Sequence, residues 1–166
     1  GEPLCWLAFG PLATSAALIS VTPKEYFNNG IPWSIAITLS AGPALATTLI
    51  LFCSHFHQVT EDKNYGKKSP IVRLGTQRAA ELIPWIISLV FILEAIPIML
   101  GLWHWLTILS LVSLPSGIVL IRLLRRHHNQ PEKISGSKFL AIRFQFLNGI
   151  GLSIGLVLAN FFQTIK

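Results

Sequence analysis

The chain has 166 residues and a net charge of +6, with 52% hydrophobic residues against only 12% charged ones. Soluble domains usually carry about twice that charged fraction. The composition therefore excludes a disordered chain, a disulfide scaffold and an ordinary soluble α/β enzyme. Cys5 and Cys53 both lie in apolar runs, where cysteine behaves as a small buried hydrophobe. A mean hydropathy of +0.59 is typical of a polytopic membrane protein.

Five apolar segments follow one another along the chain, at residues 4–20, 32–54, 80–101, 103–124 and 139–163. Each is about 17–25 residues long, which at about 1.5 Å per residue crosses a hydrocarbon core of about 30 Å. Backbone groups in lipid must be paired within the segment, and these runs are too long and too unalternating for barrel strands. The sequence predicts an all-α bundle of five transmembrane helices.

The positive charges are concentrated in two loops, 55–79 and 122–138, which hold ten of the 13 Lys and Arg residues. Two spans separate these loops, so both face the same side of the membrane. The positive-inside rule makes that side cytoplasmic or stromal. Gly1 is then expected on that side and Lys166 on the other. Because topology accounts for the charge, no nucleic-acid partner is expected.

Several residues inside the spans favour bends or close helix contacts. Proline removes a backbone donor and favours a kink, and a small-xxx-small pair permits close packing. The prolines are Pro11, Pro43, Pro84, Pro97 and Pro115, and the small pair is Gly151 and Gly155. Either these features serve helix packing alone, or kinked helices surround a cavity.

Two charged residues lie within or beside the spans. Glu94 is mid-span, where an ionisable group suggests a functional role; alternatively it lies near the far interface, since Pro97 and Gly101 follow it. Arg143 opens the last span. It either extends to the nearby interface or faces a ligand bound on the basic side.

The loop after the second span, SHFHQVTEDKNYGKKSPIVRLGTQ, combines acidic and basic groups. We expect Gln58 and Asp62 to share one face of a helical extension of that span, with His55 one turn earlier. Carboxylates that hold magnesium, beside lysines and arginines, suit a diphosphate ligand. The alternative is a solvated loop whose acids only balance its bases, with His55 and His57 as surface residues.

A family resemblance covers the chain from end to end. HFHQVTEDKNYGKKSPIVRLGT resembles the second signature of the UbiA superfamily of intramembrane prenyltransferases, and most closely its naphthoate branch. The opening GEPLCWLAFGPLA is similar to the fifth span of that family, and AIRFQFLNGIGLSIGL is similar to its ninth. The loop motif is specific, and the two span matches support it.

The resemblance implies a nine-helix bundle with a central cavity, of which residues 1–166 form the C-terminal part. It also implies an enzyme that uses Mg²⁺ to transfer a prenyl group, here phytyl, from its diphosphate to 1,4-dihydroxy-2-naphthoate in phylloquinone or menaquinone biosynthesis. The first Asp-rich signature of the family is missing from these residues, so we expect this part alone to be inactive.

The resemblance also assigns roles residue by residue. Asp62 matches the second acidic position of the signature, and Gln58 stands where the first Asp is usual. Glu61 is then the candidate for the missing carboxylate, so Asp62 and Glu61 are the expected metal ligands. The residues expected to bind diphosphate are His57, Lys67, Lys68, Arg73 and Arg143.

Other functions remain open at this point. A UbiA-type enzyme could use another acceptor, such as homogentisate, 4-hydroxybenzoate or a tetrapyrrole. A non-catalytic or transport protein is a different class, in which the basic loops only set topology and Glu94 marks a conduction path. The host membrane could be a bacterial plasma membrane, a thylakoid or a plastid membrane.

Overall fold

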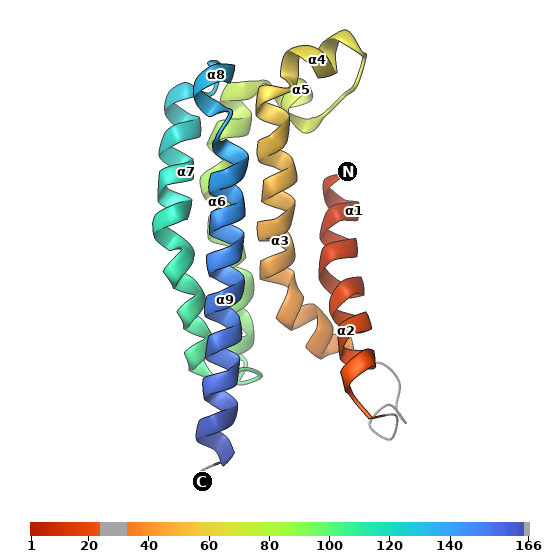
Figure 1. The fold of residues 1–166 in the computed structure, drawn as a ribbon, viewed down its shortest axis with the longest axis vertical. Helices are drawn as coiled ribbons and strands as arrows, with labels where there is room; N and C mark the ends of the chain where they lie inside the picture. Colours follow the sequence, from red (N-terminus) through yellow and green to blue (C-terminus); the bar gives the residue numbers. More distant parts are fainter. Residues whose placement is uncertain (24–32, 165–166) are drawn as a thin grey trace.

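The computed structural model describes residues 1–23 and 33–164, and these residues form helices and no strand (Figure 1). Five helical rods are long and apolar enough to cross a membrane: Glu2–Val21, Trp33–His57, Thr76–Met99, Trp105–His127 and Pro131–Phe162. The predicted all-α, five-span architecture is confirmed. Residue 32 of the second predicted span, and residues 24–31 of the loop before it, lie outside the described residues.

The described residues form eleven helical elements, of which α4 and α5 lie between the second and the third rod. In chain order these are α1 (Glu2–Leu7), the π-helical turn η1 (Ala8–Leu12), α2 (Ala13–Val21), α3 (Trp33–His57), α4 (Val59–Asn64), α5 (Pro70–Leu74), α6 (Thr76–Met99), the 3-10 helix η3 (Trp105–Ser113), α7 (Leu114–His127), α8 (Pro131–Ile134) and α9 (Ser137–Thr164). The helices α3, α6 and α9, together with the rod of η3 and α7, pack as a four-rod bundle. The first rod lies along the outer side of α3 (Figure 1).

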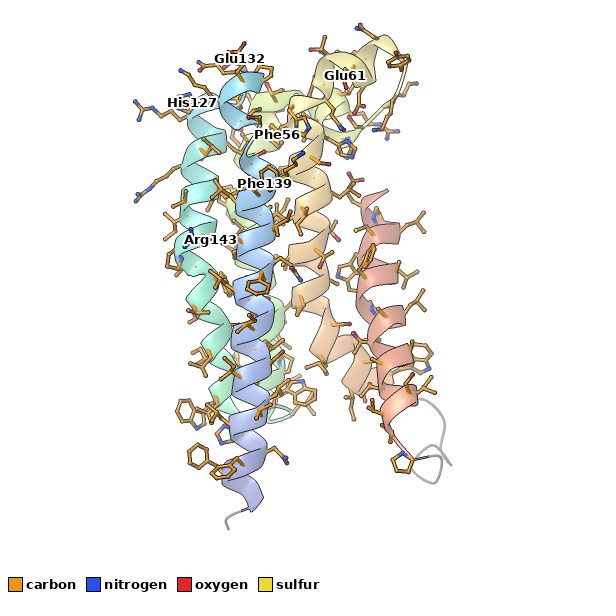
Figure 2. All side chains as sticks on the ribbon, viewed as in Figure 1. Phe56, Glu61, His127, Glu132, Phe139 and Arg143 are labelled. Atoms are coloured by element: carbon orange, nitrogen blue, oxygen red, sulfur yellow. The ribbon has the colours of Figure 1, made fainter. Side chains whose placement is uncertain are left out.

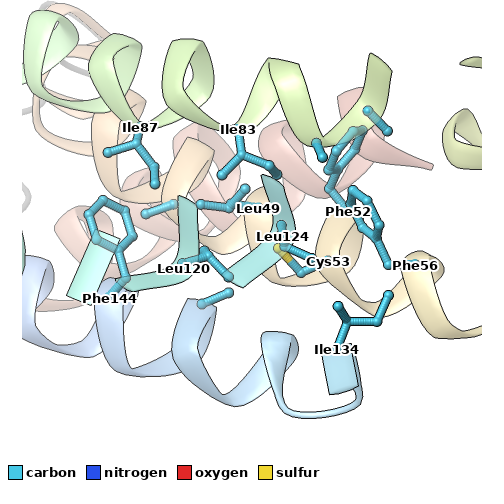
Figure 3. Close-up of a cluster of buried hydrophobic side chains, with 14 of the residues drawn as sticks. Leu49, Phe52, Cys53, Phe56, Ile83, Ile87, Leu120, Leu124, Ile134 and Phe144 are labelled. Carbon is cyan, nitrogen blue, oxygen red and sulfur yellow. The ribbon is translucent and has the colours of Figure 1, made fainter. Parts of the chain in front are cut away.

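A cluster of buried hydrophobic side chains lies in the bundle toward the end that carries α8 (Figure 3). Lipid tails are as apolar as these side chains, so close packing stabilises the helix contacts more than transfer from water does. Phe144 of α9 meets Phe91 of α6 edge to face, with ring centroids 5.9 Å apart. The fully or nearly fully buried members include Leu49, Phe52, Cys53, Phe56, Ile83, Ile87, Leu120, Leu124 and Ile134.

The predicted close contact of the last span is confirmed. A Cβ added at Gly151 would overlap the carbonyl oxygen of Leu109, and one at Gly155 would overlap that of Leu106. Both carbonyls belong to η3, so the backbones of α9 and η3 touch directly. Gly149, by contrast, has open space where a Cβ would stand.

Three prolines coincide with departures from straight α-helix. Pro11 lies in η1 next to Gly10, whose φ of −109° and ψ of −106° are not helical. Pro43 lies within α3, whose N-terminal part runs at an angle to the rest (Figure 1). Pro115 stands in the first turn of α7, so the fourth span, expected as one helix over 103–124, is divided into a 3-10 and an α segment.

The two basic loops lie at the same end of the bundle, as predicted. α4 and α5 of the first loop and α8 of the second are at the upper end in Figure 1, whereas α2 and α9 end at the opposite one. The folded loops are therefore a single polar cap over one end of the bundle.

Candidate active-site pocket

Two helix breaks fold the signature loop over the end of the second rod. α3 ends at His57, and Gln58 has φ −97° and ψ 3°, so the expected continuous extension of the second span is wrong. A separate short helix, α4, follows and ends near Gly66, whose φ of 68° suits glycine. The one-turn relation of Gln58 to Asp62 nevertheless survives, because the Asp62 N–H donates to the Gln58 carbonyl at 2.8 Å.

Asp62 is the acidic residue of the signature loop that this fold buries, with 6% of its surface exposed. Lys67 Nζ donates to Asp62 Oδ1 at 3.1 Å, and the Lys67 backbone N–H donates to the Asp62 carbonyl at 2.8 Å. The Lys67 side chain is about half exposed. Lys67 also lines the pocket, so its ammonium group can contact an anion bound there.

The electrostatic surroundings keep the Asp62 carboxyl ionised. Partial burial acts to raise its pKa, but the Ser69 hydroxyl, the Lys67 ammonium and the His55 ring outweigh it, so the pKa of Asp62 lies below its ordinary value. A charged carboxylate near a cationic pocket is the form that binds a divalent metal.

A pocket of about 810 Å³ opens beside this carboxylate, between the first rod and the signature loop. Its polar lining comes from Glu2, His55, Lys67, Lys68, Ser69 and Arg73. Three of these side chains are cations. A cavity lined in this way is suited to a multiply charged anion such as a diphosphate.

An apolar groove of about 290 Å³ adjoins the pocket and shares Glu2 and Pro70 with it. Its other lining residues belong to α3 and α6: Leu45, Thr48, Leu49, Phe52 and Ile86. A ligand with a charged head and an apolar tail can therefore place its head in the pocket and its tail along α3.

The structure does not bring every predicted site residue to this pocket. In the described part of the chain, Lys67, Lys68 and Arg73 line it, and Asp62 contacts Lys67 at its edge. Glu61 is exposed on α4 (Figure 2). The side chains of His57, Gln58 and Arg143 are not in the lining: the first two are half-buried, and Arg143 is exposed on α9.

Three polar residues of the pocket had no role assigned from the sequence: Glu2, His55 and Ser69. Glu2 was noted only within the opening GEPLCWLAFGPLA, and His55 was placed one turn before Gln58, with a surface position as the alternative. His55 is in fact buried, at 8% exposure, whereas Glu2 reaches the pocket from a different rod. His55 and Asp62 are seven residues apart, about two helical turns, and this spacing could have indicated that the two side chains are neighbours. No comparable spacing indicates Glu2, because its partners are more than 50 residues away in the sequence.

The oxygen donors here fit a metal that is shared with a substrate. Asp62 Oδ2 and Glu2 Oε1 are buried without a hydrogen-bond partner. Within the ranges that the structure describes, no three His, Cys, Asp or Glu residues gather as a complete metal cage. Magnesium commonly binds one or two carboxylates plus substrate phosphates, so Asp62 suits a magnesium diphosphate.

Comparison with known proteins places these features in a family. The model of the UbiA prenyltransferase family matches residues 1–150. The chain is 38% identical over 155 residues to the 2-carboxy-1,4-naphthoquinone phytyltransferase of Synechocystis sp., covering 93% of this chain and 48% of that protein. It is also 38% identical over 165 residues to the chloroplastic 2-carboxy-1,4-naphthoquinone phytyltransferase of Arabidopsis thaliana, covering 96% of this chain and 42% of that protein.

The chain spans about half the length of these curated relatives. No solved structure matches it. The family match covers the pocket and all but the last part of α9. By this match, and by its apolar five-rod fold, the chain belongs to the UbiA prenyltransferase family of membrane proteins.

Proposed function

We propose that this chain is the C-terminal part of a nine-helix enzyme that transfers a phytyl group from its diphosphate to 1,4-dihydroxy-2-naphthoate. The observation that carries the proposal is the cationic pocket beside the buried Asp62, continuous with an apolar groove along α3. Both relatives are named for 2-carboxy-1,4-naphthoquinone, the oxidised form of 1,4-dihydroxy-2-naphthoate, which favours a naphthoate-type acceptor over homogentisate, 4-hydroxybenzoate or a tetrapyrrole.

The pocket residues would act on the leaving group. Lys67, Lys68 and Arg73 hold the diphosphate oxygens, and Asp62 holds the magnesium that neutralises them further. The bond between the allylic carbon and the diphosphate oxygen breaks, and its electron pair leaves with the diphosphate. The allylic cation then bonds to the ring carbon that bears the carboxylate, and that carboxylate leaves as carbon dioxide.

The apolar groove gives the reaction its geometry. A prenyl tail along Leu45, Leu49 and Phe52 keeps the allylic carbon at the boundary between groove and pocket. The lining on the groove side of that boundary is mostly apolar, which disfavours capture of the cation by water there. The roles predicted for Gln58, Glu61, His57 and Arg143 stay predictions.

The test uses the full reading frame that contains this chain, expressed in membranes. With phytyl diphosphate, 1,4-dihydroxy-2-naphthoate and Mg²⁺, the expected product is demethylphylloquinol, the hydroquinone left after carbon dioxide is lost. Mass spectrometry detects it directly, or as demethylphylloquinone after oxidation by air. Asp62→Ala should lower the rate at least about 100-fold, as expected for loss of a charge-stabilising group, whereas Glu132→Gln, an exposed acid at the same end, should not. Undiminished product from Asp62→Ala contradicts the proposal, and faster turnover of homogentisate reassigns the acceptor.

A further inference from the structure

A buried histidine separates two carboxylates at the base of the pocket. His55 Nδ1 lies 3.5 Å from Asp62 Oδ2, and His55 Nε2 lies 3.7 Å from Glu2 Oε1. The ring therefore presents one nitrogen to each acid. These distances are about 0.5 Å longer than a typical N–H···O hydrogen bond.

Several unpaired polar atoms lie in this region. Glu2 Oε1, His55 Nδ1, Asp62 Oδ2 and Ser69 Oγ are each buried without a hydrogen-bond partner. Buried polar atoms without partners are costly, and the ionisable groups that act on the His55 ring include these two acids and Lys67. A ring that carries a proton on both nitrogens can donate to both carboxylates.

The first rod is anchored so that Glu2 stays in this position. Trp6 Nε1 donates to the Ala41 carbonyl at 3.1 Å, which ties α1 to α3 one helical turn below Glu2. η1 packs on the same helix, where Gly10 leaves room for Ala44. Glu2 is therefore part of a fixed contact between two rods.

We propose that His55 and Glu2 are positioning residues for Asp62: the His55 ring holds Oδ2 of the Asp62 carboxylate, and Glu2 holds the ring from the opposite side. This proposal rests on the proposed function, in which Asp62 binds magnesium diphosphate. With Oδ2 held, the carboxylate keeps one orientation when the Lys67 ammonium moves from Oδ1 to the diphosphate. Partners of this kind fix the orientation of a ligating group and support metal affinity.

The experiment measures binding rather than turnover. Mn²⁺ replaces Mg²⁺ and is titrated into the full-length protein with inorganic diphosphate, and free Mn²⁺ is followed by electron paramagnetic resonance. Loss of an outer partner commonly weakens metal affinity about 10- to 100-fold. We expect that range for His55→Ala and for Glu2→Ala, and a smaller loss for Glu2→Gln and His55→Gln, which keep a hydrogen-bonding group.

Matched controls come from the same end of the bundle (Figure 2). His127→Ala removes a histidine at the end of α7, and Glu132→Gln neutralises an exposed acid on α8. Neither residue lines the pocket in the described structure, so both variants should bind Mn²⁺ and diphosphate like the parent protein. An unchanged elution volume in detergent checks that each variant folds.

The double variant distinguishes positioning from direct metal binding. If Glu2 acts through His55, Glu2→Ala adds no further loss in the His55→Ala background. A second, additive loss would make Glu2 a metal ligand itself and overturn the proposal. Parent-like affinity in both single variants, with affinity lost in Asp62→Ala, overturns the proposal and leaves the proposed function standing. Parent-like affinity in Asp62→Ala overturns both.

Discussion

At the scale of single residues, the pocket depends on how Asp62 is held. Its backbone is tied to Gln58 and Lys67, and its carboxylate lies between the Lys67 ammonium and the His55 ring. The sequence motif places an acid and a base five residues apart, but burial of the acid comes from the break at Gln58 and the turn at Gly66. The local backbone thus converts a loop acid, expected at the surface, into a buried carboxylate.

The lowered pKa of Asp62 has a consequence for stability. A carboxyl whose pKa is lower in the folded state stabilises the fold above its unfolded pKa of about 3.9 and loses that effect as pH falls through the folded value. We expect the difference in melting temperature between the parent and Asp62→Asn to be constant from about pH 5 to 8 and to shrink below about pH 4. Thermal unfolding of both proteins in detergent measures this difference, and a gap that widens on acidification contradicts the assignment.

At the scale of elements, direct backbone contact between α9 and η3 is the tightest packing feature of the described structure. It depends on Gly151 and Gly155, whose missing side chains make room for the Leu109 and Leu106 carbonyls. Those carbonyls are backbone atoms, which cannot rotate away as a side chain would. The contact fixes α9 against the rod that Pro115 divides.

Gly151→Ala tests this contact. The added methyl group must push α9 from η3, and overpacking of this kind commonly costs about 1–3 kcal/mol. We expect a lower melting temperature for Gly151→Ala in detergent. Gly149→Ala is the matched control two residues away, where nothing lies within 4 Å of the new Cβ and alanine favours the helix. Equal melting temperatures for the two variants would show that α9 and η3 do not touch as described.

A second polar feature at this scale is Glu94 of α6. It is 8% exposed, and a Cβ at Gly42 of α3 would stand 2.6 Å from its Cγ. Ser110 of η3 and the fully buried Asn148 of α9 are its polar neighbours. The residue therefore lies inside the bundle and faces the three other rods of the bundle.

At the scale of the whole molecule, the polar cap and the apolar rods define an orientation. α4, α5 and α8 share one end with most of the Lys and Arg residues (Figure 1). We propose that this end faces the cytoplasm or the stroma. The pocket then lies near the cytoplasmic or stromal surface of the membrane.

Cysteine labelling tests the orientation. In a background with Cys5→Ser and Cys53→Ser, we expect Ser135→Cys in the cap to react with a membrane-impermeant maleimide only from the cytoplasmic or stromal side. Leu102→Cys, an exposed position between α6 and η3 at the opposite end, should react only from the other side. The reverse pattern would place the cap on the opposite face.

Several features of this protein follow from the chain alone. Apolar lengths fix five spans, because backbone groups in lipid have no partner outside a helix. The charge distribution puts both basic loops at one end, and the glycine pair predicts the contact of α9. The motif also indicates Lys67, Lys68 and Arg73 as neighbours of an acid. These are local properties, set by composition and short spacing.

The surroundings of Asp62 depend on tertiary structure. Glu2 reaches it only because α1 packs along α3, and His55 is buried only because the signature loop folds back over the helix end. Likewise, the exposure of Glu61 follows from the break at Gln58, which sets the rotation of α4. Contacts between residues 50 or more positions apart in the sequence depend on how the rods pack. The apolar faces of the rods are alike in composition, so the sequence does not indicate which faces meet. The sequence motif therefore indicates the chemistry, and the packing of the rods selects which side chains stand beside Asp62.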